Sequence, residues 1–193
     1  MIKKYLADNV PEFFFRFDTN QPFEKCTMCG ESLNGKKHVI EKVFKNNKSL
    51  NIKEILYEYA VCFDCTGQMQ GDISEESMQS MLRIMDEHKH QFVMKLEYLH
   101  ETEKYDVASW IETCSFTGKP IHLCEEYTVS AIVEDNQLVF EQAPIAVSDS
   151  FMQLIQENLS KETKDSFNGL RDKINDDSPS IEDIINTPVM GII

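Results

Sequence analysis

The sequence lacks any apolar run long enough to cross a membrane. No stretch of 18 or more apolar residues occurs, and the N-terminal segment Met1-Ile-Lys-Lys-Tyr-Leu-Ala-Asp mixes charged with apolar residues, unlike a signal peptide. These absences predict a cytoplasmic protein with no membrane partner. In that reducing compartment the six cysteines are expected to be thiols or metal ligands rather than disulfides.

Glycine is also scarce, and with it the glycine-dependent catalytic motifs. Only 7 of 193 residues are glycine, Gly118-Lys119 lacks the preceding glycine of a phosphate-binding P-loop, and no G-x-S-x-G sequence occurs. His88 and His90 are two residues apart, so they face different sides of a helix and do not form a metalloprotease motif. The sequence therefore identifies no catalytic residue, and an enzyme is the less favoured class.

Basic residues are outnumbered, with 19 lysines and arginines against 33 acidic residues and a net charge of −14. The imbalance is strongest in residues 125–193, which hold 14 acidic and 4 basic residues. Such a segment repels nucleic acid and anionic lipid. The composition therefore favours a basic protein or peptide as partner, and it leaves open whether the chain forms a homo-oligomer.

The chain does contain two C-x-x-C pairs, Cys26/Cys29 and Cys62/Cys65. Each pair can hold one ion in a tight turn, and two pairs complete the tetrahedral shell of a zinc ion. Gly30 directly follows the first pair, where the turn commonly needs a left-handed residue. We predict that these four cysteines bind one structural Zn²⁺. Four thiolates leave no open position for the water of a catalytic zinc.

Two other chemistries fit the same cysteines. A C-x-x-C pair near a helix N-terminus can be a redox dithiol, although the second pair would then lack a purpose. Iron is the other alternative, because thiolates suit both metals. Rubredoxin-type iron sites carry glycine after both pairs, whereas Thr66 follows Cys65. Zinc is the preferred interpretation.

The segments around the cysteines predict a β-hairpin followed by a helix. Residues 39–44 and 55–61 are expected to be strands, and a long helix is expected to begin near Asp72 or Ser74. A cysteine pair, a hairpin and a second pair leading into a helix resemble the treble-clef group of zinc-binding folds over roughly residues 23–100. The resemblance implies an α+β fold and a metal module, but no particular function.

The second half of the sequence repeats this order of elements. Cys114-Ser-Phe-Thr-Gly118 aligns with the first cysteine pair, residues 127–133 and 137–140 read as a hairpin, and a helix follows from Phe151. In this alignment Cys114 keeps its place, and three ligands are replaced, by Thr117, Ser148 and Phe151. We therefore predict a degenerate, metal-free repeat of the hairpin–helix module.

A rival interpretation gives the second half its own ion. Cys114, His122 and Cys124 are three possible ligands within eleven residues, and they need a fourth from elsewhere. Isolated cysteines are, however, often small buried hydrophobic residues.

The predicted organisation is an N-terminal arm at 1–22, a zinc module at 23–105, a degenerate module at 106–175 and a tail at 176–193. The predicted function is a protein-interaction or scaffold protein with one structural zinc. One alternative is nucleic-acid binding through a basic first hairpin; another is a dithiol redox enzyme or zinc hydrolase. The lysines of that hairpin region are Lys36, Lys37, Lys42, Lys45, Lys48 and Lys53.

Overall fold

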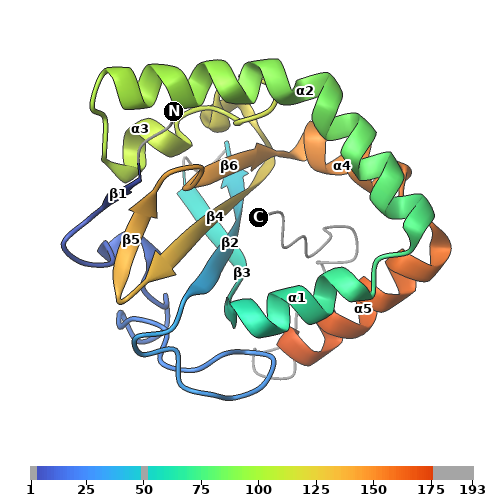
Figure 1. The fold of residues 1–193 in the computed structure, drawn as a ribbon, viewed down its shortest axis with the longest axis horizontal. Helices are drawn as coiled ribbons and strands as arrows, with labels where there is room; N and C mark the ends of the chain where they lie inside the picture. The colour runs from blue at the N-terminus through green and yellow to red at the C-terminus, as the bar shows by residue number, and fades with distance from the viewer. Residues whose placement is uncertain (1–3, 49–51, 176–193) are drawn as a thin grey trace.

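A computed structural model describes residues 4–48 and 52–175 of the chain, so the predicted tail lies outside the described residues. The fold is mixed α/β, with an antiparallel sheet (Figure 1). Its strands are β1 (Tyr5–Leu6), β2 (His38–Asn47), β3 (Ile52–Cys62), β4 (Glu126–Glu134), β5 (Gln137–Phe140) and β6 (Ile145–Ser148). Its α-helices are α1 (Phe63–Gly71), α2 (Glu75–Glu101), α3 (Val107–Ile111), α4 (Asp149–Glu157) and α5 (Lys161–Asn175), and short 3-10 helices span Glu12–Phe14 and Ile121–Leu123.

The sheet joins the two halves of the chain. Its order is β1-β5-β4-β2-β3, and β6 also pairs with β4. The antiparallel pairing of β2 with β4 places Glu41 opposite Ser130 and Lys42 opposite Val129. The two segments predicted as separate modules thus share one set of backbone hydrogen bonds.

The two predicted hairpins are present. In the first, β2 and β3 are longer than expected, with a register irregularity between Val43 and Phe44. In the second, Asp135 and Asn136 both have positive φ, the conformation of a two-residue turn that matches the twist of antiparallel strands. After β5 the chain leaves the sheet, and β6 then pairs with β4 further along.

The long predicted helix is α2, which forms an outer edge of the molecule (Figure 1). Ser74 is its N-cap and accepts a hydrogen bond from the Ser77 amide, while Glu75 and Glu76 lie in its first turn. A separate helix, α1, precedes it directly after β3 and was not predicted as a distinct element. None of the described helices is long and apolar enough to span a membrane.

The starts of α2 and α5 are joined by a cluster of hydroxyl groups. The Ser74 amide donates to Thr163 Oγ1 at 3.0 Å, and the Ser160 amide donates to Ser77 Oγ at 2.8 Å. The hydroxyl oxygens of Ser74 and Ser160 are 2.8 Å apart. A residue of α5 thus accepts a hydrogen bond from the amide just before α2, and a residue of α2 accepts one from the amide just before α5. This reciprocal arrangement connects the two halves of the chain a second time.

One large apolar cluster fills the space around the sheet. It includes Phe14 from the N-terminal arm, Trp110 from α3 and Phe140 from β5, all with at most 1% of their surface exposed. Phe17 of the same arm is 77% exposed. The aromatic segment of the arm is therefore partly core and partly surface.

Candidate metal centre

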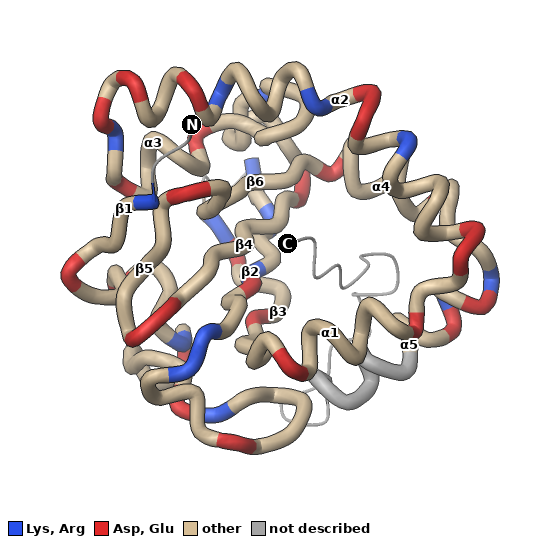
Figure 2. The backbone as a smooth tube through the Cα atoms, in the orientation of Figure 1, with Lys and Arg blue, Asp and Glu red and all other residues tan. Residues whose placement is uncertain are grey.

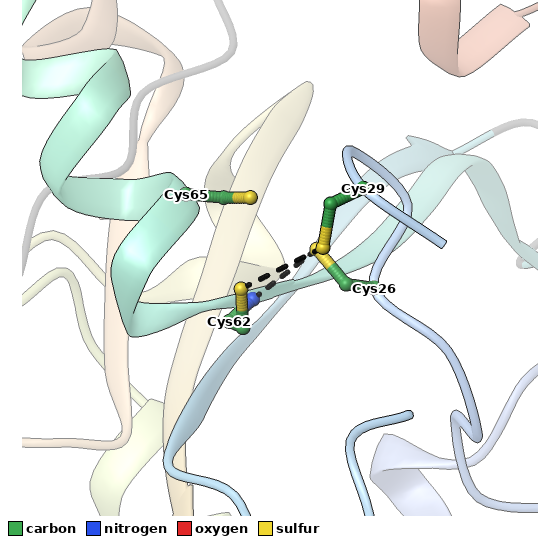
Figure 3. Close-up of side chains that lie close together, drawn as sticks. All are labelled: Cys26, Cys29, Cys62 and Cys65. Carbon is green, nitrogen blue, oxygen red and sulfur yellow. Dashed lines mark hydrogen bonds between the residues drawn. The ribbon is translucent and has the colours of Figure 1, made fainter. Parts of the chain in front are cut away.

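The four cysteines of the two C-x-x-C pairs come together in space (Figure 3). Their sulfur atoms all lie within 4.8 Å of one another, and the Sγ atoms of Cys29 and Cys62 are 4.0 Å apart. Sulfurs bound tetrahedrally to one zinc ion at about 2.3 Å lie about 3.8 Å from each other. The cluster could therefore hold a metal ion and is consistent with a zinc site.

The first pair lies in a tight loop closed by a bridge between Lys25 and Ser32. The Cys26 amide donates to the Glu31 carbonyl at 2.8 Å, and the Gly30 amide donates to the Cys26 carbonyl at 2.8 Å. Gly30 has a φ of +73°, a conformation that costs glycine little and other residues more. The loop geometry thus explains the glycine that the sequence places after Cys29.

The second pair lies where β3 ends and α1 begins. Cys62 is the last residue of β3 and the N-cap position of α1, and Cys65 lies in the first turn of that helix. The Cys62 amide also donates to Cys26 Sγ at 3.4 Å, which connects the two pairs directly.

The thiols of the cluster differ in how readily they ionise. Burial alone would raise the pKa of Cys26, but hydrogen bonds from the backbone of Cys62, Cys29 and Met28 outweigh it and lower the pKa to about 7. Burial raises the pKa of Cys62 and, together with hydrogen bonds from neighbouring thiols, that of Cys65 far above its ordinary value. Cys26 therefore ionises more readily than Cys62 and Cys65, and a bound cation would favour the thiolate forms of those two residues.

Three of the four cysteines are buried, and Cys29 is the exposed member. A closed shell of four sulfurs offers no free coordination position for a substrate. The chemistry that this arrangement supports is metal binding that holds the first loop against the β3–α1 junction.

A second loop, at residues 114–119, has backbone hydrogen bonds that match those of the first cysteine loop, but it lacks the pair of cysteines. The Cys114 amide donates to the Lys119 carbonyl at 2.8 Å, and the Gly118 amide donates to the Cys114 carbonyl at 2.9 Å. Gly118 has a φ of +71°, close to that of Gly30. The Ser148 amide donates to Cys114 Sγ at 3.4 Å, the distance found between the Cys62 amide and Cys26 Sγ.

Aromatic side chains pack around this second loop. Phe151, in the first turn of α4, is 1% exposed and stacks on Phe116 with ring centroids 4.6 Å apart. Phe92 stacks on the other side of Phe116 at 5.2 Å, and His88 meets Phe151 edge-on. Ser148 caps α4 by accepting a hydrogen bond from the Phe151 amide. These contacts stabilise the loop through apolar burial.

The alternative second ligand set is not assembled in the part of the chain that the structure describes. Cys114 and Cys124 are buried, whereas His122 is exposed. Cys124 Sγ donates to the Pro120 carbonyl at 3.7 Å. Among the described residues, the cluster of four cysteines is the one group of three or more histidine, cysteine or acidic ligands placed for a metal.

Lys95 on α2 is a partly buried hydrogen-bond donor that was not among the residues predicted from the sequence. Its Nζ donates to the carbonyls of Trp110 at 2.6 Å and Thr113 at 2.7 Å, just before the second loop. Burial lowers the pKa of Lys95 to about 8. The helical spacing from Phe92 to Leu96 and Leu99 places Lys95 on the buried side of α2, and this spacing was the signal available in the sequence.

Comparison with known proteins adds no assignment: no family model matches the chain, and no curated protein or solved structure is significantly similar to it.

Proposed function

We propose that this chain is a protein-interaction module whose first half is held together by one structural Zn²⁺ bound to Cys26, Cys29, Cys62 and Cys65. The observation that carries the proposal is the closed set of four sulfurs, which suits zinc and leaves no position for a substrate. The acidic composition and an exposed helix face support an interaction role.

We further propose that the second half is a treble-clef-like repeat that lost its metal. The matched hydrogen bonds of the two loops and the reciprocal contacts between Ser74 and Ser160 support this interpretation. Phe151 occupies the position after β6 that Cys65 occupies after β3. In this proposal apolar packing stabilises the second half of the chain, and metal binding stabilises the first half.

The interaction surface of this proposal is the C-terminal half of α2, here called the outer α2 face and defined by Val93, Met94, Glu97, Tyr98 and Glu101. Val93, Met94 and Tyr98 are 40%, 52% and 53% exposed, an unusual concentration of large apolar side chains on one helix. Glu97 and Glu101 lie among them and are exposed. Figure 2 shows acidic positions along this helix at the edge of the molecule.

The chemistry of the outer α2 face defines the partner. Apolar side chains interspersed with carboxylates fit an amphipathic segment that carries leucine-type residues flanked by lysine or arginine. The net charge of −14 would attract such a segment before contact and repel an acidic one. The partner is therefore a basic amphipathic helix of another protein.

The test is binding of a fluorescently labelled 18-residue helical peptide made of lysine and leucine, measured by anisotropy at 150 mM salt. We expect a dissociation constant on the order of 10 μM, typical of a small interface. Replacing Met94 with Asp and Glu97 with Lys should weaken binding by about tenfold, because about 1.4 kcal/mol of contact and charge is lost.

The matched control, Glu157→Gln on α4, changes the net charge by the same +1 at an exposed residue away from the outer α2 face, and should retain most of the affinity. A peptide with glutamate in place of lysine should not bind. Equal binding by the outer-face variant and the control variant would contradict the proposed surface, while leaving the zinc site untouched.

Nucleic-acid binding through the first hairpin is less well supported. Lys42 is buried and forms an ion pair with Glu58 at 2.8 Å. Lys48 donates to the Leu123 carbonyl at 3.3 Å, and Lys45 lies 4.0 Å from Glu126. Lysines occupied within the molecule offer less charge to phosphates. For a dithiol redox or zinc hydrolase activity, the described residues add no further histidine or carboxylate ligand to the four-cysteine cluster.

A further inference from the structure

A cavity of about 750 Å³ lies between the N-terminal arm, the first cysteine loop and the turn that joins β4 to β5. Its volume is in the range of small-molecule binding sites. Phe15, Phe23 and Ile40 provide apolar and aromatic walls. Buried Lys42 donates a hydrogen bond to the Phe15 carbonyl, which fixes the arm and makes this wall part of the folded structure.

His38 lines this cavity with only 4% of its surface exposed. Its Nδ1 lies 2.8 Å from the Lys36 carbonyl, which can only accept, so Nδ1 carries the proton. Nε2 is then an acceptor, and it has no hydrogen-bond partner among the residues that the structure describes. Nε2 is not one of the fully buried atoms that lack a hydrogen-bond partner, so water or a ligand in the cavity can donate to it.

Asn34 is an exposed residue of the cavity lining whose side-chain amide can donate a hydrogen bond. The Gly35 amide donates to Asn136 Oδ1 at 3.1 Å, and Asn136 Nδ2 donates to Asn34 Oδ1 at 2.7 Å. This chain of hydrogen bonds orients the Asn34 amide and leaves its Nδ2 group without a partner in the described part of the chain. Asn34 and Asn136 both line the cavity, as His38 does, so its lining holds a side-chain donor and a side-chain acceptor.

We propose that this cavity binds a small planar heteroaromatic molecule with a ring N–H directed at His38 Nε2 and a ring nitrogen or carbonyl acceptor directed at Asn34 Nδ2. The aromatic rings of Phe15 and Phe23 suit a flat ligand, which they can contact by its faces or edges. The cavity adjoins the first cysteine loop through Lys25, but none of the four cysteines and no residue of the outer α2 face lines it.

Three bicyclic probes of similar shape test the proposal by calorimetric titration of the whole zinc-loaded protein. Benzimidazole has both the donor and the acceptor, indole has only the donor, and benzothiophene has neither. We expect benzimidazole to bind most tightly and benzothiophene at least about tenfold more weakly, because each unmet polar group reduces affinity by roughly that factor.

Two variants test whether His38 and Asn34 cause the differences in affinity between the probes. His38→Leu should bring benzimidazole and benzothiophene to within about twofold of each other, and His122→Leu, which changes an exposed histidine outside the cavity, should leave the ratio unchanged. Asn34→Leu changes an exposed residue and should remove the preference for benzimidazole over indole. Zinc content and thermal unfolding report whether each variant is folded.

Three results would overturn the proposal. The first is absence of binding by all three probes up to their solubility. The second is equal affinity of the three for the unaltered protein. The third is a benzimidazole preference that Asn34→Leu does not change, and this variant decides the matter if His38→Leu fails to fold.

Discussion

Replacing Cys29 with serine is expected to abolish tight zinc binding and to unfold much of the chain at ordinary temperature. Structural zinc sites contribute about 10–16 kcal/mol of apparent binding free energy in small zinc modules, comparable with the whole stability of a domain. Cys29 is the exposed ligand, so its replacement changes core packing least. The loss of stability will therefore report the metal. Elemental analysis after dialysis and thermal unfolding followed by circular dichroism measure the two effects.

The matched control is Cys124→Ser, which alters a buried cysteine outside the cluster. It should keep one zinc per chain, although it loses some packing. If Cys29→Ser retained full zinc content and an unchanged melting temperature, the four-sulfur site would not be a structural metal centre.

Replacing Lys42 with methionine is expected to lower the free energy of unfolding by about 3–5 kcal/mol, because it leaves a carboxylate without its buried partner. Only 3% of the Lys42 side chain and 15% of the Glu58 side chain are exposed, and the two groups are 2.8 Å apart. The same substitution removes the hydrogen bond to the Phe15 carbonyl, so the N-terminal arm should also become more accessible to protease. Urea denaturation and limited proteolysis measure these changes.

Lys45→Met on the same strand provides the comparison. The Lys45 side chain is 48% exposed and 4.0 Å from Glu126, so its pair should contribute about 0–1 kcal/mol. Equal effects of the two substitutions would show that the buried ion pair does not stabilise the sheet in the way described.

The candidate metal ligands could be predicted from the sequence because their spacing encodes a local geometry. Cys26, Cys29 and Gly30 form one tight turn, and the second pair occupies a strand-to-helix junction, so each pair is shaped by neighbouring residues. The two hairpins were also predictable, since alternating apolar residues and turn residues mark them. These features depend on short segments of the chain.

Features that depend on tertiary packing could not be predicted in this way. The pairing of β2 with β4 joins residues about 90 positions apart, and no local pattern specifies it. The separate helix α1 contains two glycines and has little amphipathic pattern, so its sequence gives a weak helical signal. Its position directly before α2 made the two helices hard to separate.

The burial of Lys42 in the first hairpin could not be predicted from the local sequence either. A charged residue such as Lys42 is ordinarily solvated, yet it is buried on β2, donates to the Phe15 carbonyl of the N-terminal arm and pairs with Glu58. His38 is buried at the edge of a cavity whose walls come from three separate segments. Burial of a polar residue by a distant segment is a property of the whole fold, and composition alone does not reveal it.

X-ray absorption spectroscopy at the zinc edge, combined with elemental analysis, on protein purified without added metal tests the proposed zinc site most directly. We expect one zinc per chain surrounded by four sulfur atoms at about 2.3 Å. Iron in place of zinc, a shell containing oxygen, or metal-free protein whose four thiols oxidise reversibly would contradict it.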